Sequence, residues 1–285
     1  MKKFLAGLLV GALLFSAIPL LAAAGLMLTP VEYPVLVNGA EYTDQEYPLL
    51  NYEGRTYLPL AKIGDLLKVK YLWNEEKSQV EIGEAQVFDV SKLKAAEDAD
   101  KLVITVGQAG PHATIYAYEK TDGAWVEKYK MEGFVGRNGI TSSKREGDGE
   151  TPAGVYSLSK PFGTAADPGS LLPYTQLTAN DFWVDDADSK YYNMWAYGDA
   201  ADKDWNSAED LSKETVAYKY AMVIDYNMDP IVKGDGSAIF LHCSTDGATA
   251  GCVSVGEEDM IKLLQFIDGD TKMVIAQSVR ELNKY

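Results

Sequence analysis

Short runs that alternate apolar and polar residues fill most of the chain beyond residue 100. They predict strands at KLVITVG (101–107), GVYSLSK (154–160), YAMVIDYN (220–227), SAIFLHC (237–243) and KMVIAQSV (272–279). The segment ATIYAYEKTDGAWVEKYKMEG (113–133) predicts two strands joined at Asp122-Gly123, because Asp-Gly is a strong signal for a hairpin turn. This region is therefore expected to consist mainly of β-sheet.

One helix is clearly indicated in the same region. Glu257, Glu258 and Asp259 follow Gly256, and acidic residues are favoured in the first turn of a helix. The apolar residues that follow have helical spacing: Met260, Ile261, Leu263, Leu264 and Ile267. The chain is accordingly predicted to be mainly β, in the α+β class, with few helices, and its second domain to extend over residues 101–281.

Residues 33–83 have the pattern of a smaller α+β domain. Turns are predicted at Asn38-Gly39 and Glu53-Gly54. The apolar spacing from Leu60 to Leu67 predicts one short helix. Residues 84–100 lose the alternation and are rich in charged side chains, which is typical of a linker between two domains.

The first 24 residues are predicted to form a secretory signal peptide. Lys2 and Lys3 precede an apolar run that ends in the small residues Ala22 to Ala24. An uncleaved membrane anchor is the alternative, since the run is nearly long enough to span a bilayer. The chain carries 26 Lys and Arg against 42 Asp and Glu, a net charge of -16. Such a surface repels phosphate backbones, so no binding to nucleic acid is expected.

The residues with the most reactive side chains lie close together in one window of the sequence. The chain has two histidines and two cysteines, and His242, Cys243 and Cys252 lie within eleven residues. A loop rich in small residues after the strand at 237–243 would bring the Cys252 sulfur to the His242 ring. An imidazole within hydrogen-bond reach of a thiol is what nucleophilic catalysis needs. Gly251 leaves room for a substrate, and the Gly251 and Cys252 amides could point at a developing oxyanion.

Three other interpretations of this window stay open on the residues alone. A Cys243–Cys252 disulfide is sterically possible across such a loop, and exported proteins often contain disulfides. A zinc site is a second alternative, although it would need a fourth ligand and would use two adjacent residues. Simple core packing is the third, since free cysteines are commonly buried.

Further motifs stand in order along the second domain. GRNGITSSKREGDGETPAGVYSL (136–158) is followed by FWVDDADSKYYNMW (182–195), WNSAEDL (205–211) and the window, which reads H-x(n)-[ST]-x-G-C. Together they resemble the L,D-transpeptidase catalytic domain of the YkuD type over about residues 102–280. The resemblance implies a β-sandwich catalytic domain with few helices.

The resemblance also implies roles for individual residues. Cys252 would be the nucleophile and His242 its general base and proton donor. Gly251 would contribute an oxyanion-hole amide, and the backbone carbonyl of Cys243 would orient His242. The candidates for contact with substrate are Lys144, Arg145, Trp183 and Tyr192. Commoner members of the family read S-H-G-C with Arg or Asn two places later, whereas this chain has Thr249-Ala250-Gly251-Cys252 and then Ser254.

The first domain resembles a second family. VNG (37–39), GRTYLPL (54–60) and the spacing of the short helix are similar to the small stalk domain named for the copper amine oxidase N-terminus. Residues 33–83 contain no His or Cys, so no copper site is expected there. The resemblance implies a spacer or a module for attachment to the cell wall.

The function implied by these resemblances is that of a secreted, wall-associated peptidoglycan L,D-transpeptidase. It would form an acyl-thioester with a stem peptide and transfer it to an amine, with no cofactor and no metal. An L,D-carboxypeptidase, which resolves the same thioester with water, is the alternative in the same class. A non-catalytic wall-binding module with a Cys243–Cys252 disulfide is the alternative from another class.

Overall fold

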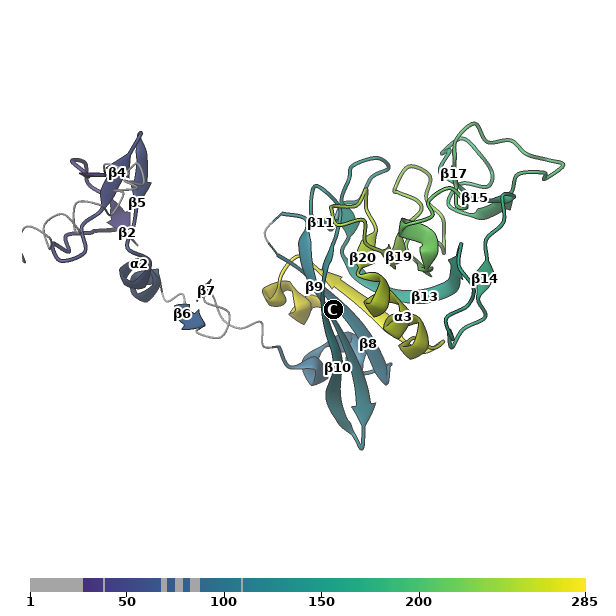
Figure 1. Ribbon diagram of the computed structural model, residues 1–285, viewed down its shortest axis with the longest axis horizontal. Helices are drawn as coiled ribbons and strands as arrows, with labels where there is room; N and C mark the ends of the chain where they lie inside the picture. Colours follow the sequence, from purple (N-terminus) through teal and green to yellow (C-terminus); the bar gives the residue numbers. More distant parts are fainter. Residues whose placement is uncertain (1–27, 38, 68–70, 75–78, 83–87, 109) are drawn as a thin grey trace, which may run out of the picture. The chain divides into compact units, whose positions relative to one another are not determined.

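A computed structural model describes residues 28–285 except 38, 68–70, 75–78, 83–87 and 109 (Figure 1). The chain divides into two compact units, residues 1–85 and 86–285. The expected signal segment, residues 1–24, lies outside the described residues. In the described part of the chain, no helix has the length and apolar character needed to cross a membrane.

The first unit is a set of short strands with one helix. Its elements are β1 (Thr29–Pro30), β2 (Leu36–Val37), β3 (Ala40–Glu41), β4 (Leu50–Tyr52), β5 (Arg55–Tyr57), α2 (Leu60–Leu67), β6 (Tyr71–Asn74) and β7 (Gln79–Ile82). The predicted turn at Glu53-Gly54 joins β4 to β5, and both residues have positive φ, 49° and 78°. A two-residue turn of this kind matches the twist of the flanking strands. The predicted helix at Leu60 to Leu67 is α2.

A nine-stranded sheet organises the second unit. Its strands, in spatial order, are β14 (Thr175–Gln176), β13 (Gly154–Gly163), β18 (Ala221–Ile224), β19 (Phe240–Cys243), β20 (Val253–Val255), β10 (Ala124–Phe134), β9 (His112–Thr121), β8 (Lys101–Gly107) and β21 (Lys272–Ala276). Because β13 also pairs with β21, the sheet curves back on itself into a barrel-like sandwich. The predicted mainly β fold is thus confirmed.

The interior of this sheet is filled by alternate strand residues and one helix. Val103, Ile115 and Leu241 belong to the same buried cluster as α3 (Glu257–Phe266), whose Met260 and Leu263 are fully buried. The helix begins at Glu257, directly after its N-cap Gly256, as the acidic residues predict. The other face of β8 is apolar as well, with Leu102, Ile104 and Val106 all buried, so both faces of this strand are covered.

The expected linker differs from what the structure shows. Residues 88–100 form two short 3-10 helices, η1 (Val90–Lys92) and η2 (Lys94–Ala96), and pack on the outer face of β8, β9 and β21. Val90 and Leu93 are 4% and 1% exposed. The charged residues of this stretch face solvent while its few apolar ones are buried. Its packing against the sheet could therefore not be predicted from composition alone. The second unit therefore begins near residue 86.

An insertion between β14 and β18 packs against one face of the nine-stranded sheet. It contains a small antiparallel sheet, β16-β15-β17, made of β15 (Asp181–Val184), β16 (Trp195–Tyr197) and β17 (Ala208–Asp210), and ends in the 3-10 helix η3 (Ala217–Lys219). Figure 1 shows β15 and β17 beside the end of β13 and β14. Trp183 of β15 packs edge-on against Phe240 of β19, with ring centroids 5.0 Å apart. The insertion thereby forms one wall beside β19.

Candidate active site

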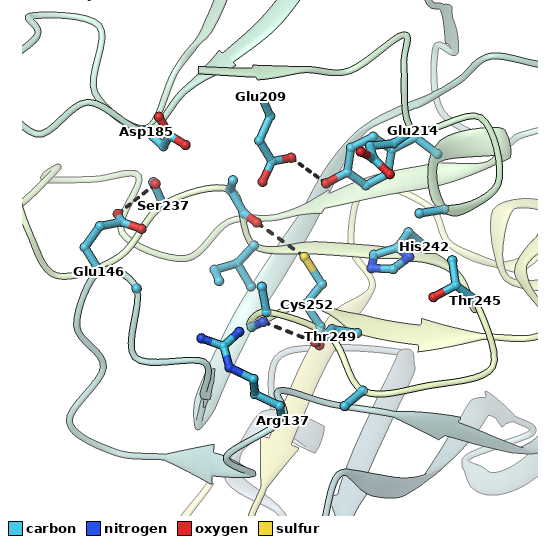
Figure 2. Close-up of a pocket in the computed structure, with 18 of the residues that line it drawn as sticks. Arg137, Glu146, Asp185, Glu209, Glu214, Ser237, His242, Thr245, Thr249 and Cys252 are labelled. Atoms are coloured by element: carbon cyan, nitrogen blue, oxygen red, sulfur yellow. Dashed lines mark hydrogen bonds between the residues drawn. The ribbon is translucent and has the colours of Figure 1, made fainter. Parts of the chain in front are cut away.

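Cys252 is positioned by the parallel pairing of β19 and β20. Leu241 lies opposite Val253, so Cys252 precedes β20 at the level of Phe240. The Phe240 N–H donates to the Cys252 sulfur (3.4 Å). The thiol donates to the Ala238 carbonyl (3.3 Å), a bond that Figure 2 shows as a dashed line. The strand predicted from residue 237 begins only at Phe240, because Ala238 adopts a positive φ of 53°. That conformation presents the Ala238 carbonyl to the thiol.

His242 lies in the same cavity as the thiol (Figure 2). Its Nδ1 is 2.8 Å from the Cys243 carbonyl oxygen. A carbonyl only accepts, so Nδ1 carries the proton and Nε2 keeps a free lone pair. The Tyr218 ring packs edge-on against the imidazole, with centroids 5.7 Å apart. In the described part of the chain no hydrogen bond joins His242 to Cys252; the thiol is bonded to Ala238 instead.

Both groups are neutral in this arrangement. Burial raises the pKa of the Cys252 thiol to about 12, and the Phe240 N–H opposes this only in part. Burial also lowers the pKa of His242 below its ordinary value. Transfer of the thiol proton to Nε2 would generate the reactive thiolate. The site therefore holds a neutral thiol and a neutral imidazole, and the proton has not been transferred between them.

The second cysteine belongs to a different environment. Cys243 follows His242 on β19, and successive strand side chains point to opposite faces. Its thiol lies in the buried cluster with Leu241 and donates to the Tyr220 carbonyl (3.5 Å). Both cysteines are free thiols. The disulfide of the non-catalytic alternative is not formed. Among the described residues, no cluster of His, Cys, Asp and Glu has a geometry that could hold a metal ion.

Gly251 and Thr249 shape the backbone before the cysteine. The Gly251 N–H, expected as an oxyanion donor, donates to the Thr249 hydroxyl (3.1 Å), which in turn donates to the Cys252 carbonyl (2.7 Å). A Cβ on residue 251 would lie 3.1 Å from the Glu150 carbonyl oxygen and 3.2 Å from the Ile239 side chain. The close approach of these groups explains why glycine occupies the position.

The cavity around the thiol has a volume of about 480 Å³. It is lined by residues of the 137–147 segment, the insertion, β19 and the 245–252 loop. Its charged residues are two cations and five carboxylates, namely Arg137, Lys144, Glu146, Asp185, Glu209, Asp210 and Glu214. No role for these carboxylates follows from the sequence, although Asp185 and Glu209 fall within two of its motifs, FWVDD and WNSAEDL.

Of the two basic residues expected to contact substrate, one lines the cavity. Lys144 is 6% exposed, and its ammonium donates to Asp148 (2.6 Å) and to the Arg145 carbonyl (2.9 Å). Arg145 is not among the lining residues; its guanidinium pairs with Asp235 (2.8 Å) at the surface. Arg137, which the sequence analysis did not single out, contributes a second cation to the lining.

The two aromatic candidates stand behind the cavity wall. Trp183 and Tyr192 are each 1% exposed and are not among the lining residues. The Trp183 indole N–H donates to Asn193 (3.0 Å), and the Tyr192 hydroxyl donates to Glu146. Tyr192 thereby supports Glu146, which faces the cavity, whereas Asn193 is itself 1% exposed and is not among the lining residues.

The fold and the site define a mainly β protein with a cysteine and a histidine in one cavity. The family model for the YkuD L,D-transpeptidase catalytic domain matches residues 103–275, and the chain belongs to this family. No curated protein matches the chain. The match leaves the first unit outside, so its likeness to the copper amine oxidase N-terminal domain stays a prediction.

The solved structures to which the chain is similar have low sequence identity to it. Bd1075 of Bdellovibrio bacteriovorus is 15% identical with a TM-score of 0.36, over 67% of this chain and 55% of that one. Enterococcus faecium L,D-transpeptidase, solved as a cysteine-to-serine mutant, is 10% identical with a TM-score of 0.29, over 84% and 92%. The avibactam carbamoyl enzyme of Ldtfm is 11% identical with a TM-score of 0.30, over 84% and 90%. The chain thus spans about half the length of the Bdellovibrio protein.

Proposed function

We propose that this protein is a peptidoglycan L,D-transpeptidase of the cell envelope that uses Cys252 as its nucleophile. Membership of the L,D-transpeptidase family supports the reaction class. The single observation that carries the proposal for this chain is the placement of Cys252 and His242 in one cavity, with the imidazole oriented by the Cys243 carbonyl. A base oriented by a third group beside a thiol is the general arrangement of an activated nucleophile.

The reaction follows from this arrangement in two steps. The Cys252 sulfur attacks the amide carbonyl before the terminal D-alanine of a stem peptide while Nε2 of His242 takes the thiol proton. The imidazolium then returns the proton to the departing D-alanine nitrogen, which leaves a thioester on Cys252. An amine from a neighbouring stem attacks the thioester, so that a new amide forms and the thiol is released.

The two cysteines provide a matched pair of variants for the test. Cys252→Ser is expected to abolish D-alanine release from a soluble tetrapeptide stem, whereas Cys243→Ser, which changes the other buried thiol, should keep most of it. Mass spectrometry of the wild type should show a covalent adduct equal to the tripeptide acyl group. If Cys243→Ser were as inactive as Cys252→Ser while still folded, the assignment of the nucleophile would be wrong.

The same assay separates the two alternatives in this class. Peptide products joined to an added amine identify a transpeptidase, and free tripeptide alone identifies an L,D-carboxypeptidase. Both share the thioester on Cys252.

A further inference from the structure

One side of the cavity carries three carboxylates. In Figure 2, Asp185 and Glu209 lie above the Cys252 thiol, Glu146 lies to its left, and Arg137 lies below it. We call Glu146, Asp185 and Glu209 the acidic wall. Asp185 directly follows β15, and Glu209 lies in β17, whose pairing with β15 sets Glu209 opposite Trp183. The antiparallel pairing of the insertion therefore brings two of the three carboxylates together.

The acidic wall has no cationic partner within the described structure. Glu146 accepts from the hydroxyls of Tyr192 and Ser237, and Glu209 accepts from the Tyr218 hydroxyl at 2.5 Å. These donors are neutral.

Asp185 has an unpaired oxygen, and two lysines near the wall are paired with other carboxylates. The Oδ1 atom of Asp185 is buried and has no hydrogen-bond partner. Lys144 is engaged by Asp148, and Lys213, two residues beyond Leu211, is engaged by Asp210. A buried carboxylate oxygen without a partner costs free energy, and that cost falls when a donor arrives. The wall thus lacks a positively charged hydrogen-bond donor.

The carboxyl of Glu209 titrates above its ordinary range. Burial, helped by the charges of Asp185, Glu214 and Glu146 and opposed by the Tyr218 hydrogen bond, raises its pKa to about 7. Near neutral pH this carboxyl exchanges its proton readily, which is the property of an efficient general base. The groups that face it are Asp185, Glu214, Glu146, Tyr218 and Cys252, and the same cavity holds Arg137, Lys144 and His242.

We propose that the acidic wall binds the acceptor of the second half-reaction as an ammonium ion, and that Glu209 takes the proton that converts it into the attacking amine. The inference builds on the proposed thioester at Cys252. An alkyl ammonium has no lone pair, so it must lose a proton before it can attack. The acidic wall supplies both the attraction for the cation and a carboxylate to accept that proton.

The acceptor nitrogen loses two protons in this step. R–NH3+ gives one proton to the Glu209 carboxylate and becomes R–NH2. Its nitrogen forms a bond to the thioester carbon, and the C–S bond then breaks, with a second nitrogen proton passing by way of His242 to the Cys252 sulfur. The products are the amide, the neutral thiol and a protonated Glu209, which releases its proton to solvent. Water is neutral and does not have to bind as a cation, so hydrolysis should depend less on the acidic wall.

The experiment compares transfer with hydrolysis in the full chain. A soluble tetrapeptide stem serves as donor and glycinamide, which carries an amine and no carboxylate, as acceptor. Glu209→Gln keeps an acceptor for the Tyr218 hydroxyl but cannot take a proton. We expect it to form the acyl-enzyme at near wild-type rate and to lower the ratio of transfer to hydrolysis by about 100-fold, the lower range of general-base catalysis.

Two further variants locate the effect. Asp185→Asn should raise the glycinamide concentration needed for half-maximal transfer. Asp202→Asn removes the same charge from the same insertion at a site where it pairs with Lys190, and should leave the ratio unchanged. In the wild type the ratio should rise with pH through about 7, and this rise should be absent in Glu209→Gln.

Two results would overturn the inference, and they are distinguishable. An unchanged ratio in Glu209→Gln, with acyl-enzyme formed normally, removes the role of the acidic wall and leaves the proposed function standing. Absence of any acyl-enzyme in the wild type removes the proposed function, and this inference with it.

Discussion

Cys252 rests as a protonated thiol whose proton is directed at a carbonyl and not at its base. A thiolate formed in this buried site would stand beside an imidazolium, and both charges would lack solvent. Under the proposed function, the thiol would therefore ionise only when a substrate carbonyl is in place to receive the electrons. Because oxidation of cysteine follows thiolate character, the neutral state should also slow oxidation of the Cys252 thiol.

Glu209 should impose a cost on the folded state that depends on pH. Its folded pKa, about 7, lies above the ordinary value of 4.5, so its contribution to stability is complete below pH 4.5 and is lost as pH rises through 7. Glu209→Gln should thus be more stable than the wild type at pH 8, by up to about 3 kcal/mol for a shift of this size. The advantage should vanish at pH 4. Urea unfolding at the two pH values measures it.

An equal effect of Glu209→Gln at both pH values would show that the variant acts through packing and not through charge. The opposite sign, with the variant less stable at pH 8, would mean that a cation already neutralises the carboxylate in the folded protein.

At the scale of elements, the buried side chain of Asn193 helps to join the insertion to the segment that precedes β19. Asn193, which follows β15, is 1% exposed. Its Oδ1 accepts from the Trp183 indole (3.0 Å) and from the Ala238 N–H (3.1 Å), and its amide group donates to the Tyr226 and Asn227 carbonyls (3.1 and 2.8 Å). Asn193 thereby fixes Ala238 in the positive-φ conformation that holds the Cys252 thiol.

Asn193→Ala is expected to destabilise the protein and to disorganise the site. It leaves two buried donors and two buried carbonyls without this partner, and one unsatisfied group costs about 1–3 kcal/mol. With partial compensation by water, a loss of about 3 kcal/mol is expected. Urea unfolding and the alkylation rate of Cys252 should both change. Asn206→Ala, on the exposed part of the same insertion, should change stability by less than about 0.5 kcal/mol.

Elements with clear periodicity were predictable, and the site was predictable only in part. β8, the hairpin of β9 and β10, and α3 follow from alternation, Asp-Gly and the acidic helix start. His242 and Cys252 were found because they lie close together in sequence. Asp185 and Glu209 are separated by 23 residues, and only the pairing of β15 with β17 joins them. Strands of three or four residues are too short for alternation to reveal their pairing.

At the scale of the molecule, the boundary between the two units decides which truncated chains should work. Residues 86–285 form one compact unit that contains the thiol, the base and the cavity. A chain beginning at Gln86 should fold and release D-alanine from soluble tetrapeptide at a rate close to that of the full chain. On intact cell wall its rate should fall if the first unit is an attachment module, because tethering raises the local concentration of substrate.

A chain that begins instead at Lys101 should be much less stable, although it retains every residue of the cavity. It lacks five buried apolar residues that cover the outer face of β8 and β21, namely Val90, Leu93, Ala95, Ala96 and Ala99. Deletion of one large buried aliphatic side chain costs about 2–5 kcal/mol, and this truncation removes two together with three alanines. Circular dichroism during heating should separate the two truncated chains by at least about 10 °C, since 1 kcal/mol shifts Tm by about 2–4 °C in a domain of this size. Equal melting temperatures would show that residues 86–100 are the linker that their composition suggests.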